Sequence, residues 1–302
     1  MAPSCLCAKS NILNFLKTMQ RREFITKTTQ ATALLAILPH ISCASKTILK
    51  GKIYNDFGIQ LWTLRDVIEE NPKNTISQVA KMGFTQIESF EGKQGIFWGM
   101  TPKDFGSFLQ DQNLTMISAH CDWTKDLQRK ASEVASIGGK YIVCPWLGPQ
   151  KTIDDYKKAA EQFNKAGELC RKAGLRFAYH NHDYSFKELE GQLPQDIFMS
   201  YTDPSLVDFE MDMYWLVTAG VDPVAYLEKY KNRFKLCHIK DRTKNSTEQF
   251  DSCTLGKGSI DYATILRKAK ATGMEYYIYE QEKYDAQGVM ANARTSAEFL
   301  KL

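Results

Sequence analysis

The chain has 302 residues, of which 43% are hydrophobic and 25% are charged. This composition is typical of a folded globular protein and excludes disordered and collagen-like chains. The formal net charge of +4 arises in residues 1–44, where five basic residues face one acidic residue, and the rest of the chain is formally neutral. A neutral body has no general attraction for a polyanion, so nucleic acid is not expected as a partner.

Residues 19–44 are typical of an export signal. The run RREFI at residues 21–25 precedes an apolar stretch at 31–38 and small residues up to Ala44. The paired arginines predict a twin-arginine signal with cleavage after Ala44, and an ordinary secretory signal is the alternative. The apolar stretch is shorter than the ~20 residues of a bilayer-spanning helix, so no membrane anchor is expected. We therefore predict an export signal at 1–44, a body at 45–302 and a periplasmic location.

From residue 53 onward, a polar amphipathic stretch, a glycine and a short apolar strand-like run recur, as around Gly83, Gly174 and Gly273. Such a glycine can adopt the left-handed conformation that ends a helix. Helix starts are indicated where a capping side chain precedes a proline, at 71–72, 101–102 and 222–223. The strands expected in chain order are residues 57–61, 84–88, 115–119, 141–144, 176–179, 207–212, 235–239 and 276–280.

Eight alternating strand and helix units predict the α/β class and a single (β/α)8 TIM barrel, which typically needs ~250 residues. A doubly wound open sheet is the alternative fold. It is disfavoured because no glycine-rich fingerprint follows the first strand.

In a barrel the chemistry gathers at the carboxyl ends of the strands. All four histidines of the body lie at such ends, together with several acids and a lysine: His120, His180, His182, His238, Glu88, Glu210, Asp212, Glu280 and Lys240. Carboxylates converging in one barrel mouth repel each other unless a cation lies between them. Imidazole and carboxylate ligands together favour Mn, Zn, Co or Fe over Mg or Ca. One divalent metal ion is therefore expected, with Mn, Zn or Co as the leading identities.

Several segments together resemble the xylose isomerase-like family of sugar isomerase and epimerase barrels. They are GIQLWTLRD at 58–66, YHNHD at 179–183, FEMDMYW at 209–215, CHIKD at 237–241, GKGSID at 256–261 and YEQ at 279–281. The resemblance implies one metal held at the ends of strands five to eight, and it places Asp212, His238 and Glu280 among the ligands. The family usually has a glutamate at the fifth strand, where this chain has His180. We assign His180 as the fourth ligand, with His182 and Glu210 as alternatives.

The resemblance also implies a sugar or polyol substrate and proton abstraction beside a carbonyl, through an enediolate. The candidates for acid–base chemistry are Glu88, His120, Lys240 and Glu280, and those for substrate contact are Gln60, Trp62, His182 and Trp215. A nearby cation would disfavour the ammonium form of Lys240 and suit it to proton transfer. The five tryptophans of the body follow or flank strand ends, where they could stack on a sugar ring. Asp183 and Asp241 are expected to orient histidines.

The leading hypothesis is thus a metal-dependent sugar isomerase or epimerase. A hydratase or lyase acting on a keto-sugar or keto-glycoside is the first alternative, because it begins with the same proton abstraction. A sugar-binding protein without activity is the second. A DNA-repair endonuclease of the same barrel type would need more histidines and a basic face. The sequence leaves the oligomeric state open.

Overall fold

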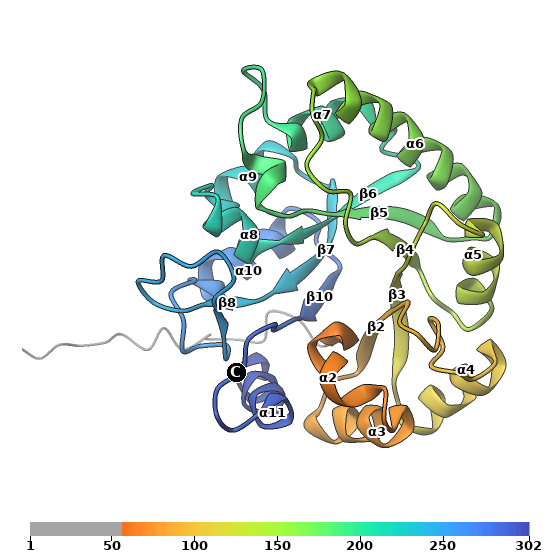
Figure 1. Ribbon diagram of the computed structural model, residues 1–302. Coiled ribbons are helices and arrows are strands. Elements are labelled where there is room, and N and C mark those ends of the chain that lie inside the picture. Colours follow the sequence, from red (N-terminus) through yellow and green to blue (C-terminus); the bar gives the residue numbers. More distant parts are fainter. Residues whose placement is uncertain (1–55, 302) are drawn as a thin grey trace, which may run out of the picture. The chain divides into compact units, whose positions relative to one another are not determined.

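The computed structural model describes residues 56–301, so the predicted export signal lies outside the described residues. Eight parallel strands close into a barrel in the order β1-β10-β7-β6-β5-β4-β3-β2 (Figure 1). Their bounds are β1 Gly58–Gln60, β2 Gln86–Phe90, β3 Thr115–His120, β4 Tyr141–Cys144, β5 Arg176–His180, β6 Val207–Asp212, β7 Phe234–Ile239 and β10 Tyr276–Tyr279. The predicted (β/α)8 TIM barrel is confirmed.

Helices surround the barrel (Figure 1). They are α2 Arg65–Ile68, α3 Pro72–Met82, α4 Pro102–Asp111, α5 Leu127–Ser136, α6 Ile153–Lys172, α7 Pro194–Tyr201, α8 Met213–Thr218, α9 Pro223–Lys229, α10 Tyr262–Ala271 and α11 Val289–Leu300. Two 3-10 helices, η1 Leu61–Leu64 and η2 Asp183–Phe186, follow β1 and β5, and a short antiparallel pair, β8 Asp241–Arg242 and β9 Ser252–Cys253, follows β7. None of the described helices combines the length and apolar character needed to cross a bilayer.

The predicted helix starts are confirmed by side-chain caps. Asn71 accepts a hydrogen bond from the Asn74 N–H, and Thr101 accepts one from the Asp104 N–H. At the other end of α3, Gly83 takes the left-handed conformation with φ of 99°, which a residue with a Cβ rarely adopts.

The strand boundaries differ from the prediction by one or two residues at several places, most of all at the first two strands. The second strand runs from Gln86 to Phe90, two residues later than expected. The first strand stops at Gln60, because its side chain accepts the Trp62 N–H and starts the 3-10 turn of η1.

The barrel interior is built in layers. Its apolar layer consists of Ile117, Tyr141, Val143, Ala178, Leu236 and Ile278, all buried. Alternate residues of a strand point to the same side, so the residues two and four positions after Leu236 also face inward. They are His238 and Lys240. The apolar layer therefore supports ionisable side chains placed above it, toward the carboxyl ends of the strands.

Candidate active site

The upper group of ionisable side chains lies at the carboxyl ends of β5, β6, β7 and β10. His180 Nε2 is 3.3 Å from Asp212 Oδ2, and His238 Nδ1 is 3.2 Å from Glu280 Oε2 and 3.7 Å from Asp212 Oδ2. Lys240 Nζ lies 3.0 Å from Asp212 Oδ2 and 2.6 Å from Glu280 Oε2. All five side chains are at most 5% exposed. The structure thus brings together the four assigned metal ligands and Lys240.

The lower group is centred on Glu88, which is completely buried. Its Oε1 accepts hydrogen bonds from Gln60 Nε2 and from His238 Nε2, both at 2.7 Å, and its Oε2 accepts one from Ser118 Oγ at 2.5 Å. His120 Nε2 lies 3.1 Å from the same carboxylate. A carboxylate with this many donors is held in place as an anion.

Glu210 completes the lower group. Its Oε2 is 2.7 Å from His120 Nε2 and 3.4 Å from His238 Nε2. Its Oε1 is buried and accepts no hydrogen bond within the described residues. His120 and His238 therefore each lie close to two carboxylates, those of Glu88 and Glu210.

The two carboxylates perturb the histidines they face. Burial disfavours the charge of His120, but Glu88 and Glu210 outweigh it and raise the pKa of His120 to about 9. Burial likewise works against the anion of Glu88, and the opposing charges of His120 and His238 hold the pKa of Glu88 well below its ordinary value. The lower group is therefore an internally neutralised set of ion pairs when no metal is bound.

The charge of Lys240 in the absence of a metal depends on the carboxylates around it. Burial disfavours its ammonium form, but the carboxylates of Asp212, Glu280 and Glu282 outweigh burial and raise the pKa of Lys240 well above its ordinary value. Lys240 is therefore a fixed cation in the metal-free site. That a bound cation would disfavour its ammonium form stays a prediction.

The upper group has the donor set for a divalent metal ion. His180 Nδ1 lies 3.2 Å from the Pro145 carbonyl oxygen, and because a carbonyl can only accept, this nitrogen carries a hydrogen. In the same way, His238 Nε2 donates a hydrogen bond to the Glu88 carboxylate, so this nitrogen also carries a hydrogen. The other nitrogen of each ring faces a carboxylate oxygen, an arrangement that needs a proton or a cation between them.

The spacing of these atoms also suits an ion. Ligand atoms ~2.1 Å from a tetrahedral metal lie ~3.4 Å apart. The distances from His180 to Asp212, from Asp212 to His238 and from His238 to Glu280 are 3.3, 3.7 and 3.2 Å. His180, Asp212 and His238 also form a compact group of metal-ligating atoms. Glu88, His120, Glu210 and His238 form a second such group in the lower layer. Of the three candidates for the fourth ligand, only His180 groups with both Asp212 and His238.

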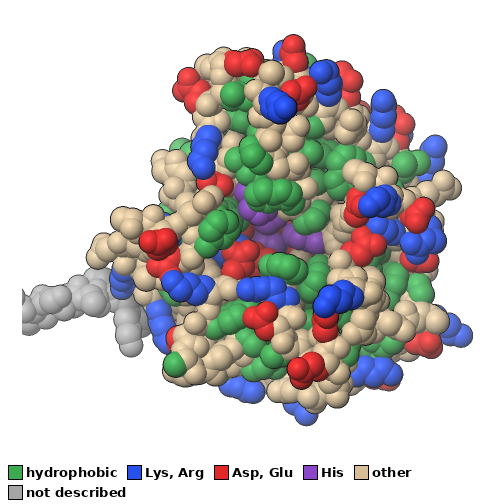
Figure 2. Space-filling model, in the orientation of Figure 1, with side chains coloured by type: hydrophobic (Ala, Val, Ile, Leu, Met, Phe, Trp, Pro, Cys, Tyr) green, Lys and Arg blue, Asp and Glu red, His purple; other side chains and the backbone are tan. Residues whose placement is uncertain are grey.

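A cavity of about 680 Å³ opens above the upper group. Figure 2 shows histidine side chains at the bottom of this depression, with hydrophobic side chains around it. Its lining includes five of the predicted site residues: Trp62, His120, His180, His182 and Glu280. Trp146 is 54% exposed and also lines the cavity. The centroid of its ring lies 4.4 Å from that of the His182 ring. Burial lowers the pKa of His182 well below its ordinary value, so this ring is neutral.

The other six predicted residues lie behind the lining rather than in it: Gln60, Glu88, Asp212, Trp215, His238 and Lys240. Gln60 and Glu88 bond to each other beneath the histidines. Trp215 is 1% exposed and packs against the rings of His182 and Phe250. Gln60, Glu88 and Trp215 support the side chains that face the cavity. The substrate contacts of Gln60 and Trp215 stay predictions.

The two aspartates expected to orient histidines have other partners. Asp241 accepts hydrogen bonds from the backbone N–H groups of Arg242, Gly256, Gly258 and Ile260. Asp183 accepts one from Gln249 Nε2 and pairs with Lys187. Both residues therefore fix loops at the rim of the barrel. A carboxylate next to a histidine in sequence was not a sufficient signal for contact.

Sequence reasoning also missed residues that complete the site. Ser118 donates to Glu88, and its position two residues before His120 on the same strand could have indicated that it faces inward. Glu282 lies 3.4 Å from Lys240 Nζ and lines the cavity. Burial raises the pKa of Glu282. No pattern in the sequence indicated that the charged residues around α5 line the cavity.

Comparisons with known proteins agree with this architecture. A profile of the xylose isomerase-like TIM barrel family matches residues 76–302. The inosose dehydratase of Bacillus cereus is 32% identical over 209 residues, which cover 60% of this chain and 68% of that protein. The inosose dehydratase of Clostridium perfringens is 28% identical over 167 residues, 51% of this chain and 53% of that protein, so this match spans about half of the relative's length.

Among solved structures, a sugar phosphate isomerase/epimerase from Parabacteroides distasonis is 29% identical and superimposes with a TM-score of 0.68. The superposition covers 87% of this chain and 97% of that one. The similar proteins thus include both dehydratases and a sugar phosphate isomerase/epimerase.

Proposed function

The chain belongs to the xylose isomerase-like TIM barrel family, and we propose that it is a metal-dependent enzyme that isomerises or epimerises a sugar or a related polyol. The reaction would begin with removal of a proton from the carbon beside a carbonyl group. The proton would then return at the neighbouring carbon or on the other face of the same carbon.

The observation that carries this proposal is the convergence of His180, Asp212, His238 and Glu280 directly below the cavity. A divalent ion held by these four side chains would act as a Lewis acid on the substrate carbonyl. Several perturbed ionisable groups in one cavity are typical of a catalytic site rather than of a site for binding alone.

The side chains around the cavity supply the remaining functions. Burial works against the anion of Glu280, but the charges of Lys240 and His238 hold the pKa of Glu280 well below its ordinary value. Glu280 is therefore ionised at neutral pH and can accept the proton from the substrate carbon. The Lys240 ammonium group can donate a hydrogen bond to the oxygen on which negative charge develops. Glu88 takes a positioning role in this scheme, because it contacts the histidines from below.

A dehydratase is the second candidate, favoured by the two inosose dehydratases at 28–32% identity. It would use the same proton removal, after which a hydroxyl group on the next carbon would leave as water. His120 lines the cavity and is protonated at neutral pH, since its pKa is raised to about 9. Its ring could therefore donate the proton that the departing hydroxyl group needs.

One experiment tests both candidates. The metal-loaded protein is incubated in D2O with a set of keto-sugars and with a cyclic keto-polyol such as an inosose, and the products are analysed by mass spectrometry. An isomerase or epimerase gives a product that has gained deuterium, whereas a dehydratase gives a product that has lost the mass of one water. Glu280→Gln should abolish both changes, and Glu275→Gln, on an exposed side chain, should not. If no substrate is deuterated or dehydrated, a sugar-binding protein becomes the better interpretation.

We also propose that residues 1–44 direct export to the periplasm through the twin-arginine route, on the basis of the RREFI run at 21–25. Replacing both Arg21 and Arg22 by Lys should then retain the protein in the cytoplasm in a cell-fractionation assay. Replacing Lys9 and Lys17 by Gln, which lowers the charge outside that run, should leave export unchanged. Normal export of the double-lysine variant would argue for an ordinary secretory signal.

A further inference from the structure

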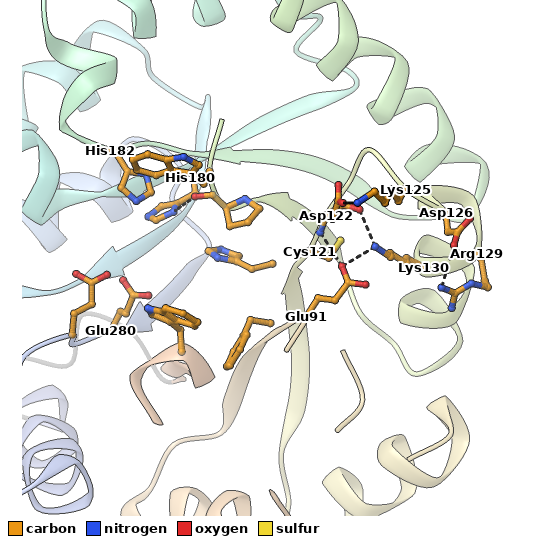
Figure 3. Close-up of a pocket in the computed structure, with 16 residues that line it drawn as sticks. Glu91, Cys121, Asp122, Lys125, Asp126, Arg129, Lys130, His180, His182 and Glu280 are labelled. Atoms are coloured by element: carbon orange, nitrogen blue, oxygen red, sulfur yellow. Dashed lines mark hydrogen bonds and ion pairs between the residues drawn. The ribbon is translucent and has the colours of Figure 1, made fainter. Parts of the chain in front are cut away.

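The cavity extends well beyond the side chains that would act on the substrate. Figure 3 shows His180, His182 and Glu280 on one side of it and a separate charged group on the other. This second group, here called the α5 lobe, consists of Glu91, Asp122, Lys125, Asp126, Arg129 and Lys130, all of which line the cavity. The whole cavity of about 680 Å³ lies in the ~300–1,000 Å³ range that accommodates drug-sized ligands. A single pyranose ring would leave much of it empty.

The two ends of the cavity come from different parts of the barrel. The assigned metal ligands follow β5, β6, β7 and β10, which are neighbours in the barrel. The α5 lobe is built after β2 and β3 and on α5. A ligand that reached both ends would therefore have to span the barrel mouth.

The base of the α5 lobe, where Glu91, Asp122 and Lys130 meet, is held together by hydrogen bonds. Lys130 is 4% exposed, and its Nζ donates to Glu91 Oε2 at 2.7 Å and to the Asp122 carbonyl oxygen at 2.8 Å. The Asp122 N–H donates to the same Glu91 oxygen at 2.9 Å. These bonds join the ends of β2 and β3 to α5. Glu91, Asp122 and Lys130 therefore present donors and acceptors in fixed positions, whereas the side chains of Lys125, Asp126 and Arg129 are 57–79% exposed.

The charges of the lobe indicate the chemistry of its ligand. Three basic side chains, Lys125, Arg129 and Lys130, are matched by three acidic ones, Glu91, Asp122 and Asp126. A phosphate or carboxylate would meet as many anions as cations there. A neutral unit with hydroxyl groups suits such a surface, because each hydroxyl can donate to a carboxylate and accept from a cation.

Aromatic rings lie between the two ends of the cavity. Trp62 is 41% exposed and packs edge-on against Phe90, with ring centroids 5.1 Å apart. Trp146 is 54% exposed, and all three rings line the cavity. Exposed aromatic faces are suited to the apolar side of a sugar ring.

We propose that the α5 lobe is a subsite for a neutral second unit of the substrate, so that the enzyme acts on a glycoside rather than on a free or phosphorylated monosaccharide. This proposal rests on the proposed function, in which the reacting sugar ring lies over His180 and Glu280. It adds that a second, hydroxyl-rich unit occupies the lobe.

Binding measurements test this subsite independently of turnover. Isothermal titration calorimetry on the metal-loaded protein compares methyl β-D-glucoside, glucose 6-phosphate and a panel of neutral glucosyl disaccharides with different linkages. We expect at least one disaccharide to bind about tenfold more tightly than the methyl glucoside, and the phosphate to gain nothing. Arg129→Ala should weaken the binding of that disaccharide about three- to tenfold, the effect of one lost hydrogen bond, and should leave the methyl glucoside unchanged. Arg171→Ala, on the exposed end of α6, is the matched control and should change neither affinity.

The outcomes separate this proposal from the proposed function. Equal affinity for one-ring and two-ring sugars, or tightest binding of glucose 6-phosphate, would overturn the subsite, even if keto-sugars are deuterated in D2O. Tight disaccharide binding that Arg129→Ala weakens would support the subsite, even if no deuterium is incorporated. An equal loss in Arg129→Ala and Arg171→Ala would show that the lobe is not the contact.

Discussion

Glu88→Gln should destabilise the metal-free protein and change how its stability depends on pH. The pKa of His120 is raised from 6.5 to about 9, which corresponds to about 3 kcal/mol of net stabilisation by Glu88 and Glu210 after the cost of burial. Assigning roughly half of this to Glu88, and adding the weakened bonds from Ser118 and His238, gives an expected loss of about 1.5–3 kcal/mol at pH 7. For a body of this size that is a decrease in Tm of roughly 3–12 °C.

The pH dependence follows from the sign of each shift. The raised pKa of His120 gives stability that is fully present below pH 6.5 and is lost as the pH rises through about 9. The wild-type free energy of unfolding should therefore fall by up to about 1.4 kcal/mol per pH unit across this window. The lowered pKa of Glu88 gives stability that is present above pH 4.5 and is lost as the pH falls below it. Glu88→Gln should flatten both slopes.

Urea denaturation in EDTA, repeated from pH 4 to pH 9.5, measures these slopes directly. Glu275→Gln removes an exposed carboxylate and is the matched control, with an expected change in the free energy of unfolding below about 0.5 kcal/mol. An unchanged alkaline slope in Glu88→Gln would refute the interpretation that Glu88 holds a proton on the buried histidines.

Three further substitutions test other parts of the site. His238→Ala should lose stoichiometric metal in elemental analysis, and retained metal would contradict its role as a ligand. Lys240→Met should lower kcat about 10²–10³-fold with a smaller effect on KM, because the oxyanion would lose its charged donor; an unchanged kcat would remove Lys240 from the mechanism. Asp241→Ala should lower the free energy of unfolding by about 2–4 kcal/mol, since four backbone N–H groups lose their acceptor. A normal denaturation midpoint would show that the loop after β9 does not depend on that carboxylate.

The fold was predictable because its signals are local. Proline after a capping side chain marked the starts of α3, α4 and α9. Glycine after a polar helix marked the end of α3, at Gly83. The boundary of β2 was harder, since Phe84 and Thr85 are as apolar or β-branched as the strand itself. They precede the strand because pairing with β1 begins only at Gln86.

Part of the candidate site was predictable from the sequence, but its division into two layers was not. The rule that chemistry collects at strand ends identified His120, His180, His238, Asp212 and Glu280. It could not show that Glu88 lies beneath the histidines, because depth depends on the stagger of neighbouring strands. Pairs of ionisable residues two positions apart, such as those at 210 and 212 or at 238 and 240, were the available signal for two layers.

His238 contacts both the upper and the lower group of ionisable side chains. This contact explains why the lower group contains charged residues. Its Nε2 donates to Glu88, while its Nδ1 lies 3.2 Å from Glu280 in the upper group. A neutral acceptor in place of Glu88 would hold that tautomer less firmly, and Nδ1 would then be protonated part of the time and unable to bind a metal ion. The same buried carboxylate that stabilises the empty barrel therefore also prepares a metal ligand. An apolar residue at position 88 would fill the space but would leave His238 without a fixed orientation.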